Sequence, residues 1–109
     1  MKFVTYINQQ TPEVGIIVNE KIYPVNKIDN AIPSQMSDIL KDWDANMVKA
    51  KEVETQILSG NHESLATALE GSNLLAPVPN PSSCRDGYAF RQHVAAARRN
   101  RNVPMIAEF

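Results

Sequence analysis

The stretch KFVTYINQQTPEVGIIVNEKIYPV, residues 2–25, decides the fold of the N-terminal part of the chain. Its β-branched and aromatic residues predict three strands, over residues 2–8, 14–19 and 21–25. The polar residues 9–12 predict one turn, and Asn19-Glu20 predicts a tight second turn, because asparagine tolerates positive φ. Pro24 removes a backbone donor, which favours an edge position for the third strand. We therefore expect a small antiparallel meander.

A helical period follows this meander. Apolar residues recur on one broad face, at Met36, Ile39, Leu40, Trp43, Met47, Val48, Val53, Ile57 and Leu58. Ser34 or Ser37 could cap the start of this long helix, and Gly60 is suited to its C′ position. A shorter helix is predicted over residues 62–69. The apolar stripe is interpreted as a core face and not as a cofactor site.

The chain changes character after residue 76. Residues 74–83 read LLAPVPNPSS, in which Leu74 to Val78 favours a short strand and the three prolines favour an extended connector. A further helix is predicted over residues 85–101, with Ser83 as its N-cap. We expect an α+β fold: a small antiparallel sheet of three or four strands packed with one long helix, followed by a C-terminal helical arm. The predicted divisions are an N-terminal domain (1–76), a Pro-rich connector (77–84) and a C-terminal segment (85–109).

Charge is distributed unevenly along the 109 residues. Residues 1–84 carry six lysines against ten acidic side chains, whereas residues 85–109 carry five arginines against two acidic side chains. The overall charge of -1 argues against a nucleic-acid-binding protein. No apolar run is long enough to span a membrane, and the N-terminus lacks the pattern of a signal peptide. The single cysteine, Cys84, suits the cytoplasm.

The residues most suited to chemistry lie at the start of the basic segment, in Asp86-Gly87-Tyr88-Ala89-Phe90-Arg91-Gln92-His93. In a helix, Asp86 and His93 would lie seven residues apart and therefore on nearly the same face. A carboxylate could hold a hard cation there, and an imidazole could activate water. The alternative is structural: Asp86 could serve a helix start, and His93 could be an ordinary surface or core histidine.

The segment LLAPVPNPSSCRDGYAFRQHVAAARRNRNVPMIAEF, residues 74–109, resembles the region that joins the N-terminal and catalytic domains of the fumarylacetoacetate hydrolase family. The shared pattern is Asp-x-Tyr-x-x-Arg-Gln-His, and the resemblance implies that residues 85–109 are the truncated beginning of the catalytic domain. The hairpin at residues 2–25 is also similar to that family's N-terminal hairpin. The resemblance implies a metal-dependent hydrolase of a carbon–carbon bond in an acylpyruvate or other diketo acid, with Mg²⁺ or Ca²⁺ as the cofactor and a homodimer as the assembly.

The same resemblance implies roles for individual side chains. His93 would be the catalytic base, Asp86 a metal ligand, and Tyr88 and Arg91 substrate contacts. The family's other acidic ligands come later than residue 109, so we expect these residues alone to be inactive, because one carboxylate cannot satisfy Mg²⁺ or Ca²⁺. Two alternatives remain: a non-catalytic relative that serves as a dimerisation or partner-binding module, and a small protein that binds an anion through its arginines.

Overall fold

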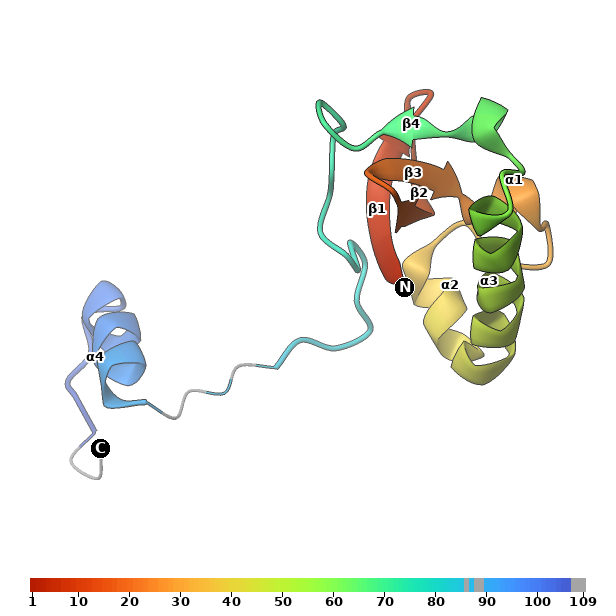
Figure 1. The fold of residues 1–109 in the computed structure, drawn as a ribbon. Coiled ribbons are helices and arrows are strands. Elements are labelled where there is room, and N and C mark those ends of the chain that lie inside the picture. The colour runs from red at the N-terminus through yellow and green to blue at the C-terminus, as the bar shows by residue number, and fades with distance from the viewer. Residues whose placement is uncertain (86, 88–89, 107–109) are drawn as a thin grey trace.

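The computed structural model describes residues 1–85, 87 and 90–106 of the chain. A four-stranded antiparallel sheet with the order β1-β2-β3-β4 forms its centre (Figure 1). Helices cover one face of this sheet, so the predicted α+β class is confirmed. The strands are β1 (Lys2–Asn8), β2 (Thr11–Val18), β3 (Lys21–Pro24) and β4 (Thr67–Ala68).

Two-residue turns join the first three strands. Asn19 and Glu20 have φ of 51° and 63°, which confirms the predicted tight turn, and Gln9 and Gln10 adopt the same conformation with φ of 51° and 70°. This first turn is shorter than predicted, so β2 begins at Thr11 and includes Pro12 opposite Ile7. The Ile7 N–H donates to the Asn73 carbonyl on the other side of β1, so this pair needs no N–H from proline.

The third strand lies at an edge only near Pro24. β4 pairs with Lys21 and Ile22, so β3 has neighbours on both sides there, whereas Pro24 faces Gly15 of β2 alone. The predicted edge strand is therefore wrong for the first half of β3. The missing N–H of Pro24 is tolerated because β4 ends before it.

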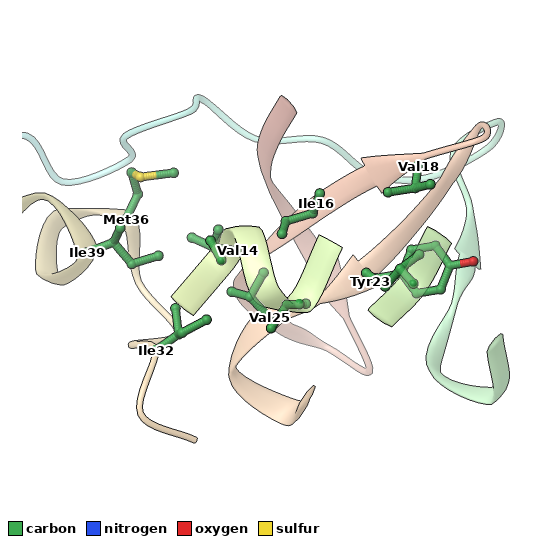
Figure 2. Packing of buried hydrophobic residues seen from close by; sticks show 11 residues of the cluster. Val14, Ile16, Val18, Tyr23, Val25, Ile32, Met36 and Ile39 are labelled. Atoms are coloured by element: carbon green, nitrogen blue, oxygen red, sulfur yellow. The ribbon is translucent and has the colours of Figure 1, made fainter. Parts of the chain in front are cut away.

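The helices α1 (Val25–Ile28), α2 (Met36–Lys41) and α3 (Trp43–Leu58) pack on the sheet. The single predicted helix is divided at Asp42, whose φ of −137° and ψ of 61° lie outside the helical region. Figure 2 shows side chains from β2, β3, α1 and α2 meeting beneath α3. The cluster consists of Val14, Ile16, Val18, Tyr23, Val25, Ile32, Met36, Ile39, Ala50, Val53 and Ile57.

The break at Asp42 changes which side chains are buried. Met36, Ile39, Val53 and Ile57 lie in the core as predicted, but the other face of α3 turns outward. Four side chains of the predicted core stripe are 40–65% exposed: Leu40, Trp43, Val48 and Leu58. Because α3 begins a new helix, its buried face runs through Asn46, Ala50, Val53 and Ile57.

The predicted capping residue is found at the end of the helical region but not at its start. Gly60 has a φ of 92°, its N–H donates to the Ile57 carbonyl, and the Asn61 N–H donates to the Gln56 carbonyl. This is a Schellman motif, which confirms the predicted end. At the start, Gln35 is the N-cap and its side chain makes no capping hydrogen bond, so the capping role predicted for Ser34 or Ser37 is wrong.

Long-range pairing replaces the helix that was predicted over residues 62–69. His62 is left-handed with a φ of 68°, and a short 3-10 helix, η1 (Glu63–Leu65), precedes β4. The Leu69 N–H donates to the carbonyl of Glu20, more than forty residues away in the chain. The pairing of β4 with β3 therefore overrides the helical propensity of this segment.

The chain then returns along the free edge of β1. The Leu75 N–H donates to the Thr5 carbonyl, the Thr5 hydroxyl donates to the Pro77 carbonyl, and Tyr6 forms an isolated bridge with Leu74. The predicted strand over Leu74 to Val78 is thus one bridge and not a regular strand. It covers an edge that would otherwise expose unpaired backbone groups.

Beyond Val78, which packs on the core, the chain leads away from this body to a separate helix (Figure 1). Helix α4 (Arg91–Asn100) begins six residues later than predicted, and Phe90, not Ser83, is its N-cap. The radius of gyration is 18.7 Å, against about 13 Å for a compact chain of this length. In the described part of the chain, none of the helices has the length and apolar character needed to cross a membrane.

Candidate active-site arm

Two of the four predicted site residues lie on α4, and two fall outside the described residues. Arg91 is the first residue of the helix and His93 lies in its first turn, and both side chains are exposed. Asp86 and Tyr88 are outside the described residues. The distance between the predicted metal ligand and the predicted base therefore stays a prediction.

One helix was expected to carry Asp86 and His93 on the same face. The start predicted for this helix, at residue 85, is wrong. Arg85, Gly87 and Phe90 are not helical, and Phe90 has an extended backbone with φ of −85° and ψ of 135°. Glycine favours such a late start, because it costs about 1 kcal/mol relative to alanine inside a helix. Any convergence of Asp86 and His93 must come from the path of the chain before α4 and not from helical spacing.

Helical geometry also separates Arg91 from His93. Residues two positions apart on an α-helix point about 200° away from each other, so these two side chains leave opposite sides of α4. Helix α4 alone therefore does not bring the two side chains onto one face.

The donor set for a divalent cation is incomplete in the described residues. Among them, no group of three or more histidine, cysteine, aspartate or glutamate side chains lies close enough together to hold a metal ion. Mg²⁺ and Ca²⁺ need six or more oxygen ligands, most of them from carboxylates, carbonyls and water. The residues that the structure places do not by themselves complete a site for the implied cofactor, and no reaction step through a metal is derived from them.

The body contains a buried polar cluster that was not predicted from the sequence. Tyr6 and Glu13 face each other across the β1–β2 hairpin, and both are buried. Glu13 accepts a hydrogen bond of 3.3 Å from the Asn8 amide and lies 3.5 Å from the ammonium group of Lys27. Only the register of the hairpin reveals this cluster, because Tyr6 and Glu13 lie directly opposite each other only when the turn is Gln9-Gln10.

The Tyr6 hydroxyl is the exceptional group in this cluster. It is buried without a hydrogen-bond partner among the described residues. Burial, and secondarily the negative charge of Glu13, raises the pKa of Tyr6 well above its ordinary value of 10.0. The phenol is therefore held in its neutral form and cannot act as a base near neutral pH. A groove of about 410 Å³ lies nearby, and Asn8, Pro24 and Lys27 are part of its lining.

Comparison with known proteins gave no relative: no family model, no curated protein and no solved structure matches this chain.

Proposed function

We propose that this chain is the N-terminal portion of a metal-dependent enzyme, similar to the fumarylacetoacetate hydrolases, that hydrolyses a carbon–carbon bond in an acylpyruvate or related diketo acid. The observation that carries the proposal is the motif from Asp86 to His93, which combines a carboxylate, a phenol, a guanidinium group and an imidazole in eight residues. The position of its second half also supports the proposal, because Arg91 and His93 lie on α4, outside a body with its own core.

In this proposal Asp86 is a ligand of Mg²⁺ or Ca²⁺, His93 is the base that activates water, and Tyr88 and Arg91 contact the substrate. The remaining metal ligands would be supplied by other residues of the assembled enzyme. The exposure of His93 and Arg91 agrees with this arrangement, since side chains that complete a site with another structural unit must be accessible. The cytoplasm is the proposed location, because the exposed thiol of Cys84 needs no oxidising compartment.

Binding of Mn²⁺ to the assembled enzyme, which contains the remaining ligands, tests the metal role of Asp86. This paramagnetic ion can replace Mg²⁺ and broadens NMR signals of nearby nuclei. We expect the signals of Gly87 and His93 to broaden at lower Mn²⁺ concentrations than those near Asp44, an exposed carboxylate on α3. The variant Asp86→Asn should abolish this preference, whereas the matched variant Asp44→Asn should leave it intact. Equal broadening at both places in the assembled enzyme, in which the remaining ligands are present, would remove Asp86 as a ligand.

The role of His93 needs the assembled enzyme, in which the missing ligands are present. Release of pyruvate from an acylpyruvate should then require Mg²⁺ and should fall by at least about 100-fold in His93→Ala, the usual range for loss of a general base. Normal pyruvate release in this variant would show that another group activates water.

A second candidate function is a non-catalytic module for dimerisation or partner binding. One specific observation favours it: α4 stands apart from the body, and the adjoining Phe90 side chain is 82% exposed. An exposed aromatic side chain beside arginines is typical of residues that anchor protein–protein interfaces. This candidate predicts self-association without any affinity for a metal ion.

A further inference from the structure

The C-terminal arm carries an apolar anchor beside positive charge. We define the basic arm as residues 90–101, which include Phe90 and four arginines. Phe90 is 82% exposed, which is the largest exposed fraction among the large apolar side chains described. Arg91 and Arg99 are exposed as well. Burial of an aromatic ring of this size lowers the free energy, so the exposed Phe90 ring is suited to contact a partner surface.

The body carries a surface with the opposite charge and exposed apolar groups. We define the Leu40 surface as Leu40, Trp43, Asp42 and Asp44, at the junction of α2 and α3. Leu40 is 48% exposed and Trp43 is 40% exposed, with its ring held edge-on against Phe3 at a centroid distance of 6.0 Å. Asp42 and Asp44 form no ion pair within the described part of the chain.

A groove borders this surface. Leu40 and Lys41 line one side of it, and Val78 and Ser82 line the other, around a volume of about 300 Å³. Lys41 is already paired with Asp38 at 3.1 Å. Asp42 directly follows the groove-lining Lys41 in the chain, and neither Asp42 nor Asp44 is paired with this lysine. An apolar groove followed in the chain by two exposed carboxylates suits an aromatic side chain followed by arginines.

We propose that the basic arm of one chain docks on the Leu40 surface of a second copy of this chain, and that the exchange is reciprocal. This inference rests on the second candidate function and names the surfaces that would carry out its dimerisation. Phe90 enters the groove beside Leu40, and the arginines of the arm face Asp42 and Asp44. A two-fold axis forms each contact twice, which doubles the apolar area buried.

The path of the connector favours a second copy over the arm's own body. Val78 is packed on the core and Ser82 lines the groove, so the connector leaves the body beside the Leu40 surface itself. From there the chain leads outward (Figure 1), and Pro79 and Pro81 favour an extended backbone. The arm would have to reverse its direction to dock on its own body, whereas a second copy receives it without such a reversal.

Charge reversal separates the two arrangements. The arm variant Arg91→Glu/Arg99→Glu and the surface variant Asp42→Lys/Asp44→Lys should each be monomeric, with the dimer Kd raised at least about tenfold, or about 1.4 kcal/mol. Mixing the two variants should restore a dimer of twice the 12.1 kDa chain mass, because both exchanged contacts are then complementary. Sedimentation velocity measures these masses.

An anchor variant and a matched control complete the test. Phe90→Ser should also raise the Kd at least about tenfold, whereas Val48→Ser, at a side chain that is 61% exposed elsewhere on α3, should leave it unchanged. A monomeric unaltered chain at millimolar concentration overturns the proposal, as does a mixture of the charge variants that stays monomeric. None of these measurements involves a metal ion or a substrate, so failure of the enzyme proposal would not affect them.

Discussion

Gly15 of β2 is the position at which one added methyl group should destabilise the body most directly. A Cβ atom on Gly15 would overlap with Cγ2 of Ile22 and would lie 2.8 Å from Cε1 of Tyr6 and 3.1 Å from the carbonyl oxygen of Tyr23. Ile22 and Tyr6 are both fully buried, so neither can swing into solvent. The third contact belongs to the backbone, which cannot rotate away.

The expected loss follows from these three contacts. Overpacking of a core costs about 1–3 kcal/mol, and the upper end applies here because none of the three atoms can move freely. Alanine recovers about 0.5–1 kcal/mol by restricting the unfolded chain. The net loss for Gly15→Ala is therefore about 2 kcal/mol, equivalent to a fall in Tm of about 8–16 °C.

Urea unfolding measures this loss through the fluorescence of the single tryptophan, Trp43, which packs against Phe3 in the body. A loss of about 2 kcal/mol should lower the midpoint by about 1–2 M. Gly87→Ala is the matched control, because a Cβ there meets no atom within 4 Å, and its effect should stay within about 0.5 kcal/mol. A midpoint for Gly15→Ala that equals that of Gly87→Ala would refute the packing argument.

Two further substitutions test the buried polar groups. Tyr6→Phe should leave the body as stable at pH 7, or up to about 1 kcal/mol more stable, because it removes a hydroxyl that has no partner in the part of the chain described here. Because the pKa of Tyr6 is raised in the folded state, the unaltered chain loses stability as the pH rises above 10.0. Urea midpoints at pH 7 and 10.5 should therefore show that the stability advantage of Tyr6→Phe grows with pH. An advantage that shrinks with pH would contradict the assigned direction of the pKa shift. Asn46→Ala should cost about 1–2 kcal/mol, because the buried Asn46 amide donates to the Ile39 carbonyl at 3.1 Å and joins α3 to α2. Val48→Ala, at an exposed position on α3, is its control, and equal midpoints for these two variants would count against the bond.

Local sequence signals predicted the elements whose conformation depends on neighbouring residues. The strand over residues 2–8, the turn at Asn19-Glu20 and the helix end at Gly60 are all confirmed. Each depends on side-chain alternation or on a residue that accepts positive φ. The same signals failed over residues 62–69, where helix-forming residues adopt β4, because pairing with β3 depends on residues far away in the chain.

The candidate site was also predictable from the sequence only in part. The presence of a C-terminal helix with Arg91 and His93 was predictable from residue preferences. The start of this helix was not predictable. Because the helix begins only at Arg91, the argument from helical spacing that placed Asp86 beside His93 no longer applies. The roles of these residues stay predictions, because Asp86 and Tyr88 lie outside the described residues and no relative was found that would assign them.

The sequence by itself determined the α+β class, the meander, the burial of the stripe at Met36, Ile39, Val53 and Ile57, and the contrast between an acidic body and a basic arm. Only the tertiary structure decided that Leu40 and Trp43 face solvent, that Tyr6 is enclosed beside Glu13, and that the edge of β1 is covered. The physical reason is the range of the interactions. Backbone preferences and side-chain periodicity act within a few residues, whereas burial and strand pairing depend on segments that meet only after the chain has folded.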